Sequence, residues 1–423
     1  MSFNIWWLIL YFSIVCQAKA HYSLRDFKAN IFQVKYQWKY FDYNFGSDEK
    51  RQAAIQSGEY NYKNNVPIDV DRWNGKTFVT ILRNDGVPSS LNVISNKIGN
   101  GGPLLEPYPN WSWAKNQNCS GITSVYRIAI DEWDRLWVLD NGISGETSVC
   151  PSQIVVFDLK NSKLLKQVKI PHDIAINSTT GKRNVVTPIV QSFDYNNTWV
   201  YIADVEGYAL IIYNNADDSF QRLTSSTFVY DPRYTKYTIN DESFSLQDGI
   251  LGMALSHKTQ NLYYSAMSSH NLNYVNTKQF TQGKFQANDI QYQGASDILW
   301  TQASAKAISE TGALFFGLVS DTALGCWNEN RPLKRRNIEI VAKNNDTLQF
   351  ISGIKIIKQI SSNIYERQNN EYIWIVSNKY QKIANGDLNF NEVNFRILNA
   401  PVNQLIRYTR CENPKTNFFS IFL

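Results

Sequence analysis

The sequence contains few of the residues from which metal sites and common catalytic centres are built. Its 423 residues include four histidines and five cysteines, with no Cys-x-x-Cys pair and no Gly-x-Ser-x-Gly segment. Asp69-Val70-Asp71 resembles the start of a calcium loop, but the acidic residue that such a loop needs at its far end is missing. These absences argue against a zinc site and against a serine hydrolase of the nucleophile-elbow type. We expect no metal ligands, no cofactor and no catalytic residues.

Charge and long apolar runs are scarce as well. The net charge is +5 and is dispersed along the chain, which argues against a nucleic-acid partner. The longest apolar run, Ile5–Val15, has about eleven residues, whereas a membrane-spanning helix needs roughly twenty. Ala18-Lys19-Ala20 supplies a small-x-small cleavage pattern behind it. We therefore expect residues 1–20 to be a signal peptide, no membrane partner, and a secreted protein in which residues 21–423 form a single domain.

A unit of two short strands and a turn recurs along the chain. In residues 124–142, Ile128 and Ile130 alternate with polar or small neighbours, a charged turn follows, and Leu136–Leu139 form an apolar second strand. The second strands of the six units begin at Thr77, Leu136, Val200, Leu262, Leu314 and Ile373. Because a period of about sixty residues indicates radial repetition of small sheets, we predict an all-β fold, a six-bladed β-propeller. A β-sandwich is the alternative, but it does not explain so long a period.

The segments between these units are assigned from their composition. Residues 34–45 are rich in aromatic side chains and are predicted to form a strand that completes the last blade beside residues 394–400. Residues 53–73 are interpreted as an extended connector and residues 99–113 as a long loop. Residues 278–293 are polar and without period, and we interpret them as a loop between blades four and five.

Cysteine usage agrees with secretion. Four cysteines lie beyond the expected signal peptide: Cys119, Cys150, Cys326 and Cys411. An even number suits two disulfides in an oxidising compartment, although three pairings are open. We favour Cys119 with Cys150, which would bracket the second unit, and Cys326 with Cys411, which would tie the fifth unit to the C-terminal segment.

Five Asn-x-Ser/Thr sequons are candidates for glycosylation in a secreted chain. They stand at Asn110, Asn118, Asn177, Asn196 and Asn345. Asn118 is the weakest candidate, because the middle residue of its sequon is Cys119 and a disulfide there would restrict access. The motif is short, so chance matches are expected in a sequence rich in asparagine.

Polar residues at the ends of the predicted blades are the candidates for a ligand site. They are Asp140, Asn141, Asp204, Asp248 and Asn378. In a propeller such residues lie near the mouth of the central channel, where a carboxylate would hold a cation or orient an amine. Turn chemistry is the competing interpretation, since Asp-Asn-Gly and Asp-Gly segments form turns without any ligand. For the set as a whole we favour turns.

Several longer stretches resemble the major royal jelly protein and yellow family of insects. They are QWKYFDYNF, KRQAAIQSGEY, NNVPIDVDRWNGKTFVTILRNDGVPSSLNVIS, YPNWSWAKNQNCSGITSVYRIAIDEWDRLWVLDNG and LQDGILGMALS. The likeness extends over nearly all of the chain, from Lys35 to Cys411, and is closer to the royal jelly branch than to the pigmentation-type yellow proteins. It implies a six-bladed propeller, secretion, glycosylation, and a role in food jelly or in venom.

Two functions compete. The first is a secreted, non-catalytic glycoprotein, a nutrient, jelly or venom component, which carries a small ligand in the central channel, either a biogenic amine or a sterol. The aromatic content of 14% supports an aromatic-lined pocket for such a ligand. The second is an enzyme, either a yellow-type enzyme that converts dopachrome or a calcium-dependent propeller hydrolase. The lack of a recognisable catalytic constellation favours the first function, and the sequence leaves the oligomeric state open.

Overall fold

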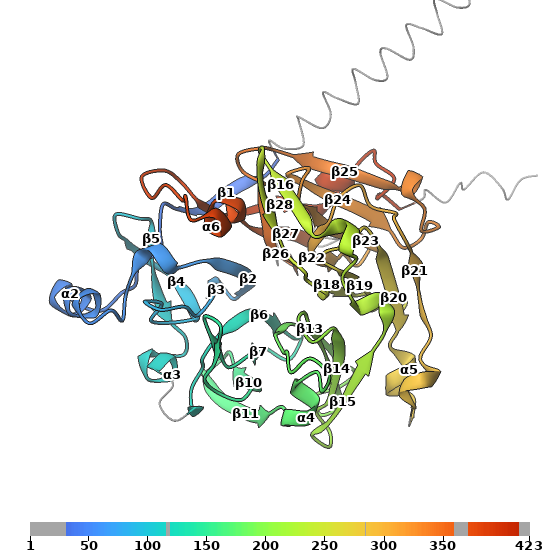
Figure 1. The fold of residues 1–423 in the computed structure, drawn as a ribbon, viewed down its shortest axis with the longest axis horizontal. Helices are drawn as coiled ribbons and strands as arrows, with labels where there is room; N and C mark the ends of the chain where they lie inside the picture. Colours follow the sequence, from blue (N-terminus) through green and yellow to red (C-terminus); the bar gives the residue numbers. More distant parts are fainter. Residues whose placement is uncertain (1–30, 116–118, 284, 359–370, 414–423) are drawn as a thin grey trace, which may run out of the picture.

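Six four-stranded antiparallel sheets, or blades, stand in a ring around a central axis (Figure 1). The structure is a computed structural model and describes residues 31–115, 119–283, 285–358 and 371–413. Each blade begins with an inner strand at the axis, and the inner strands of neighbouring blades contact one another all around the ring. The chain is therefore an all-β six-bladed β-propeller, as predicted. The signal peptide expected at residues 1–20 lies outside the described residues.

The blades follow one another in chain order. Blade 1 comprises β2 (Pro67–Trp73), β3 (Lys76–Ile81), β4 (Leu91–Ile98) and β5 (Pro103–Pro107). Blade 2 comprises β6 (Val125–Ile130), β7 (Arg135–Asp140), β10 (Gln153–Asp158) and β11 (Lys163–Lys169). Blade 3 comprises β12 (Val185–Ser192), β13 (Thr198–Asp204), β14 (Ala209–Asn214) and β15 (Ser219–Thr224).

The second half of the ring has the same plan. Blade 4 comprises β18 (Ile250–Leu255), β19 (Asn261–Ala266), β20 (Leu272–Asn276) and β21 (Tyr292–Ala295). Blade 5 comprises β22 (Ala303–Ile308), β23 (Ala313–Leu318), β24 (Ala323–Asn328) and β25 (Ile338–Lys343). Blade 6 comprises β26 (Phe350–Lys358), β27 (Glu371–Asn378), β28 (Phe395–Pro401) and, from the start of the chain, β1 (Gln33–Trp38).

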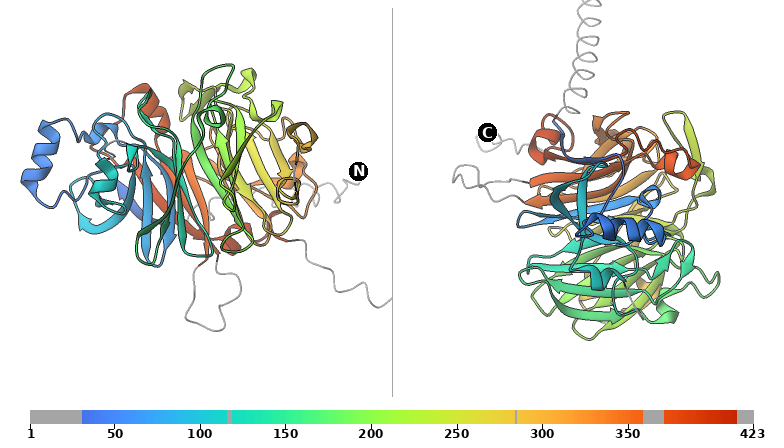
Figure 2. Two further views of the ribbon diagram at one scale, coloured as in Figure 1. Left: turned by 90° about the horizontal axis from the view of Figure 1, so that it is seen from below. Right: turned by 90° about the vertical axis from the view of Figure 1, so that its left-hand side faces the viewer.

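Short helices and hairpins fill the connections, and one helix projects from the rim of the ring (Figure 2). The helices are α2 (Asp48–Gln56), which projects, and α3 (Trp111–Lys115), α4 (His172–Ala175), α5 (Lys278–Thr281), α6 (Tyr380–Asn385) and α7 (Val402–Ile406). The hairpins are β8 (Ile143–Ser144) with β9 (Thr147–Ser148), and β16 (Lys236–Ile239) with β17 (Glu242–Ser245). The 3₁₀ helices are η1 (Tyr62–Asn64), η3 (Ser226–Phe228), η4 (Pro232–Tyr234), η5 (Ala287–Asp289) and η6 (Arg335–Asn337). None of the helices in the described part of the chain has the length and apolar character needed to cross a membrane.

The apolar second strands lie where the repeat predicts them. The six runs fall within β3, β7, β13, β19, β23 and β27, the second strand of each blade. All six residues of β7 are buried. A strand inside a blade packs against a neighbouring blade on each face, so it needs apolar side chains on both faces rather than an alternating pattern.

The ring closes between the two ends of the chain. The first strand, β1, pairs antiparallel with β28, with Gln33 opposite Asn399 and Trp38 opposite Phe395. Blade 6 therefore takes its outermost strand from the N-terminal segment, which confirms the predicted completion of the last blade. The strand is shorter than predicted and ends at Trp38, after which Tyr43 forms an isolated bridge to Leu105 of blade 1.

Three connecting segments differ from their predictions. Residues 53–73 contain the end of α2 and the inner strand β2, which was missed because the buried acids Asp69 and Asp71 interrupt its apolar pattern. Residues 99–113 contain β5, a short outer strand whose position at the edge tolerates proline. Residues 278–293 lie inside blade 4, between β20 and β21, and not between blades.

Every inner strand changes register against its blade partner near its start. The shifts lie at residues 67–70, 125–128, 185–187, 250–253, 303–306 and 351–353. In β6, for example, Val125 pairs with Asp140 and Ile128 with Val138, so two residues stand opposite one. A β-bulge of this kind re-aims side chains out of the regular ladder. The six bulges therefore decide which side chains face the axis.

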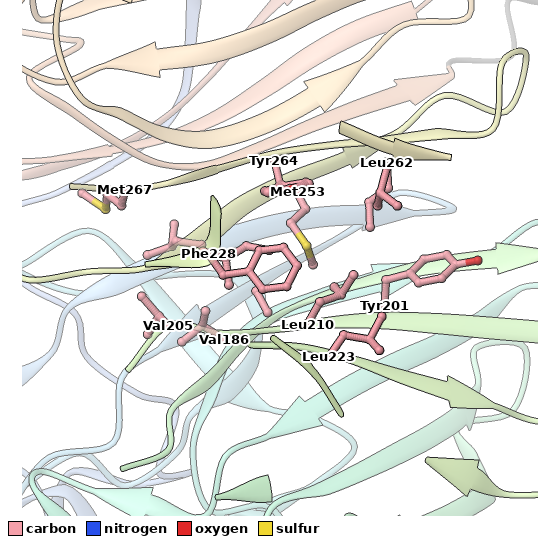
Figure 3. Close-up of a cluster of buried hydrophobic side chains, with 14 of the residues drawn as sticks. Val186, Tyr201, Val205, Leu210, Leu223, Phe228, Met253, Leu262, Tyr264 and Met267 are labelled. Atoms are coloured by element: carbon pink, nitrogen blue, oxygen red, sulfur yellow. The ribbon is translucent and has the colours of Figure 1, made fainter. Parts of the chain in front are cut away.

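The core lies between neighbouring blades. Figure 3 shows the cluster between blades 3 and 4, where Tyr201 and Leu210 of blade 3 meet Met253, Leu262 and Tyr264 of blade 4. Buried apolar area of this kind supplies roughly 25 cal/mol per Å². The ring is therefore stabilised blade against blade, with no core separate from the blade contacts in the described part of the chain.

Two disulfides join Cys119 to Cys150 and Cys326 to Cys411. These are the two pairs that the sequence favoured. The first connects the segment before β6 with the segment before β10, so both of its cysteines belong to blade 2. The second connects β24 of blade 5 with a residue beyond α7, and both sulfur-bearing residues lie in one buried apolar cluster.

Replacement of Trp137 tests the packing between blades. Trp137 lies on β7, is 1% exposed, and donates its indole N–H to Asp131 Oδ2 at 2.8 Å. Trp137→Ala should lower the free energy of unfolding by about 3–5 kcal/mol, because it leaves a large cavity. Trp133, in the turn before β7, is 42% exposed, and Trp133→Ala should cost less than about 1 kcal/mol. Urea unfolding followed by circular dichroism measures both, and equal losses would show that β7 is not buried.

Candidate functional site

Arg127 divides the central channel into two cavities. It lies in the bulge of β6, is 6% exposed, and lines both cavities. Its Nη1 donates to Thr187 Oγ1 of blade 3 at 3.2 Å, and its Nη2 donates to the main-chain oxygen of Ser352 of blade 6 at 2.8 Å. The guanidinium therefore links three blades across the axis. We call the cavity at the start of the inner strands the upper cavity, and the other the lower cavity.

The upper cavity has a volume of about 200 Å³ and is lined mainly by the bulged starts of the inner strands. These contribute Ile68, Tyr126, Val186, Leu251, Ser304 and Ser352. Segments that follow the second strands add Leu82, Val205, Glu206 and Met267. Leu246, Asp248, Phe350 and Tyr380 complete most of the remaining wall. The cavity is thus largely apolar and aromatic, with two carboxylates.

Asp248 supplies a carboxylate without a protein donor. Its main chain is fixed by Ser268, whose Oγ accepts from the Asp248 amide and whose amide donates to the Asp248 carbonyl oxygen. Within the described residues its carboxylate accepts no hydrogen bond. Burial and, to a smaller extent, the nearby Glu206 raise the pKa of Asp248 to about 7, although Arg127 opposes both effects. A cation in the upper cavity would stabilise the ionised form of this group.

Glu206 is held by a chain of amide side chains. Its Oε1 accepts from Asn184 Nδ2 at 2.9 Å, and the same Nδ2 lies 3.4 Å from the Tyr126 hydroxyl. Asn184 Oδ1 in turn accepts from Asn141 Nδ2 at 3.0 Å. Asn141 is therefore not part of the cavity wall. It orients Asn184, which in turn orients Glu206.

Aromatic rings form one side of the upper cavity. The Tyr380 ring stacks on Phe350 with a centroid separation of 4.8 Å and an interplanar angle of 24°. It also meets the edge of Phe244 at 5.3 Å. These contacts fix the position of the Tyr380 ring, so the carboxylates have a preorganised aromatic surface beside them.

The five predicted ligand residues separate into different roles. Asp248 lines the upper cavity, and Asn141 supports it from behind. Asp140 accepts from the amide of Gly142, which closes a turn, and from the amides of Thr123 and Ser124, which tie that turn to the segment before β6.

Asp204 and Asn378 also serve the fold. Asp204 accepts from the amides of Asn184 and Gly207 and pairs with Arg222 at 2.9 Å. Asn378 donates to the main-chain oxygen of Pro67, which ties blade 6 to blade 1. Turn and blade contacts therefore account for Asp140, Asp204 and Asn378.

Sequence reasoning missed most of the cavity residues. Tyr126, Arg127, Glu206 and Tyr380 come from three blades and have no shared spacing. A signal for Arg127 was present, because a charged residue interrupts an otherwise apolar inner strand. Among the described residues, no group of three or more His, Cys, Asp or Glu side chains is placed to hold a metal ion.

The sequons differ in their accessibility. Asn110, Asn196 and Asn345 are exposed, whereas Asn177 is half-buried and donates its amide to the main-chain oxygen of Gly207 at 3.0 Å. Asn118 lies outside the described residues. Glycosylation stays a prediction at each of the five.

Comparison with known proteins shows the family to which the chain belongs. The family model described as "Major royal jelly protein" matches residues 123–411. The chain belongs to the major royal jelly protein family. Major royal jelly protein 8 of Apis mellifera is 63% identical over 415 residues, which cover 97% of this chain and 99% of that protein. Major royal jelly protein 1 of the same bee is 56% identical over 414 residues, or 96% of each chain.

A more distant relative of this major royal jelly protein carries the name of an enzyme. Dopaminechrome tautomerase of Drosophila melanogaster is 28% identical over 431 residues, which cover 94% of this chain and 89% of that protein. Among solved structures, a luciferin-regenerating enzyme covers 82% of this chain and 92% of its own, with 10% identity and a TM-score of 0.44. That likeness is too low to carry an argument about function.

Replacement of Asp248 should change how stability depends on pH. The unfolded chain ionises this carboxyl near a pKa of about 3.9, whereas the folded chain holds its pKa at about 7. Between these values the folded state binds the extra proton, so this group's contribution to stability is lost as the pH rises from about 4 to about 7. Asp248→Asn has no charge to bury and escapes this loss, which is on the order of 2–4 kcal/mol at pH 8.

Urea unfolding at pH 4 and pH 8 measures this difference. We expect Asp248→Asn to exceed the native chain in stability at pH 8 and to differ from it by less than about 1 kcal/mol at pH 4. Glu132→Gln, in an exposed turn of blade 2, is the control and should follow the native chain at both values. A variant that loses the same stability at both pH values would contradict the burial of an ionisable Asp248.

Proposed function

We propose that this protein is a secreted, non-catalytic binding protein that carries a small organic ammonium compound in the upper cavity. The observation that supports this most strongly is the carboxylate of Asp248, which accepts no hydrogen bond from the described residues and lies beside Glu206 in a largely apolar and aromatic cavity that Arg127 also lines. Two acids that repel each other at close range gain most from a shared cation. A protonated amine with a ring supplies that cation together with an apolar body.

The volume of the cavity limits the size of the ligand. Its volume of about 200 Å³ is below the roughly 300–1,000 Å³ of pockets that hold drug-sized ligands. A compact amine with one or two rings therefore fits the cavity better than a sterol. The ammonium group would bind Asp248 and Glu206, and a neighbouring tyrosine face would add about 0.5–2 kcal/mol by cation–π contact.

Secretion rests on separate support. The apolar run and cleavage pattern in residues 1–20 are those of a signal peptide. Two disulfides suit an oxidising compartment outside the cytosol. Together with membership of the major royal jelly protein family, these features support a role as a component of a secreted fluid, whether jelly or venom.

An enzyme is the second candidate. A carboxyl with a pKa of about 7 lies in the range that suits a general base, and Asp248 has this pKa inside a cavity. The Drosophila melanogaster relative named Dopaminechrome tautomerase makes a tautomerisation the reaction to test. The calcium-dependent hydrolase has no comparable support, since no group of three or more His, Cys, Asp or Glu side chains among the described residues is placed to hold a metal ion.

Calorimetric titration tests the binding proposal directly. Serotonin and dopamine should bind the native chain, and a soluble sterol should not. Asp248→Asn and Glu206→Gln should each weaken amine binding at least tenfold, whereas Glu132→Gln should leave it unchanged. Because Asp248 is ionised only above its pKa of about 7, amine affinity should fall between pH 8 and pH 6.

A dopachrome turnover assay on the same samples separates the two candidates. Binding without turnover supports a carrier. Turnover by the native chain that is lost in Asp248→Asn would show that the protein is an enzyme rather than a carrier. Absence of both amine binding and turnover would refute both uses of the upper cavity.

A further inference from the structure

The lower cavity differs from the upper one in its chemistry. It has a volume of about 230 Å³ and lies at the end of the channel where the inner strands finish. Half-buried aliphatic side chains from four blades stand around it: Ile130, Val190, Ile308 and Ile356. At the division between the cavities these give way to charged groups, among them Arg127, Lys306 and Lys355. An apolar ring thus leads to a cationic end.

Lys306 is a buried cation without a counter-ion. It lies on β22 and is 5% exposed, and its Nζ donates to the main-chain oxygen of Ser304 at 3.3 Å. No carboxylate of the described residues lies within ion-pair distance of this Nζ. Gly252 of the neighbouring blade lies against it, and a Cβ there would stand 3.2 Å from Nζ. Gly252 and Lys306 both line the lower cavity.

Arg127 also has a hydrogen-bond donor without a partner among the described residues. Its two terminal nitrogens bond to Thr187 and Ser352, but its Nε has no partner among the described residues. Lys355 differs, since its Nζ pairs with Asp69 Oδ2 at 3.1 Å and donates to the main-chain oxygen of Ile128 at 2.6 Å. Among the described residues, Lys306 and Arg127 therefore form no ion pair, although Asp69 and Asp248 lie near enough to Arg127 to favour its charged form.

Buried charges without partners are costly in free energy, and a bound ligand of opposite charge would offset this cost. Burial and, to a smaller extent, the charge of Arg127 lower the pKa of Lys306 to about 7. A bound anion would offset both effects and would use the free Nε of Arg127. The aliphatic ring would meanwhile cover an apolar chain attached to that anion.

We propose that the lower cavity binds a medium-chain carboxylate, with its carboxylate between Lys306 and Arg127 and its alkyl chain against the aliphatic ring. A planar carboxylate matches two converging nitrogen donors. Inorganic phosphate matches the charge but leaves the aliphatic ring uncovered. This site lies on the other side of Arg127 from the upper cavity, whose lining contains Asp248 and Glu206.

The charged groups around the site give it a pH dependence. The element β2 contributes Asp69 and Asp71, β6 contributes Arg127, β22 contributes Lys306, β26 contributes Lys355, and His257 follows β18. The lining residues of β12 carry no charge. Burial raises the pKa of Asp71, Lys355 opposes the rise and Asp69 supports it, and the net result is a pKa of about 7. Below pH 7 Asp71 is therefore neutral while Lys306 is charged, and both changes favour an anion.

Octanoate is the probe for this proposal, titrated calorimetrically into the full secreted chain. We expect saturable binding to one site, at least fivefold tighter at pH 6 than at pH 8. Lys306→Met should weaken it at least tenfold, and Lys236→Met, on the exposed face of β16, should not change it. Octanol, which lacks the charge, should bind at least tenfold more weakly than octanoate.

Several results would overturn the proposal. They are no binding at millimolar octanoate, equal binding of octanol, full affinity in Lys306→Met, or binding of inorganic phosphate alone. If Lys306→Met fails to fold, the native chain decides: octanoate must raise its melting temperature more at pH 6 than at pH 8. Asp248→Asn should leave octanoate binding intact, so failure of the amine site and failure of this site are distinguishable.

Discussion

Each inner strand slips against its blade partner just where six strands must converge on one axis. A regular ladder would point alternate side chains at the neighbouring blades and leave few directed along the channel. The bulges break that alternation at the same level in all six blades. Tyr126 and Arg127, at successive positions of one bulge, both line the channel for this reason. The cavities and their charges all depend on this displacement.

Arg127 then decides what the channel can hold. A guanidinium fixed at both terminal nitrogens cannot move aside easily, so the channel is two short cavities rather than one pore. Its positive charge also acts on the charged groups of both cavities. It partly offsets the repulsion between Asp248 and Glu206 on one side, and it adds to the positive charge around Lys306 on the other. The two binding sites that we propose would therefore take ligands of opposite charge, and their affinities would change in opposite directions with pH.

The sequence predicts the framework of this molecule better than its cavities. Strands such as β7 are apolar on both faces because blades cover them, and a continuous apolar run is visible in a single sequence. The inner strand β2 is not visible in the same way, since Asp69 and Asp71 are buried in a channel rather than in a core. Tyr126, Glu206 and Tyr380 meet only because the ring brings three blades together. No local sequence spacing indicates that these three residues meet. The bond from the Gly142 amide to Asp140 is local and agrees with the turn that Asp-Asn-Gly predicts, whereas the bonds from Thr123 and Ser124 are not local.

The pairing of β1 with β28 has a consequence for biosynthesis. The ribosome makes β1 before every other strand of the ring and β28 after all of the others, so the two partners are separated by almost the whole of translation. At about 5–20 residues per second this interval is roughly 20–70 s. For that time β1 has no partner, and five blades stand as an open arc with an uncovered face at each end. Until its last strand emerges, the nascent chain therefore exposes strand edges and apolar blade faces that favour association with other chains.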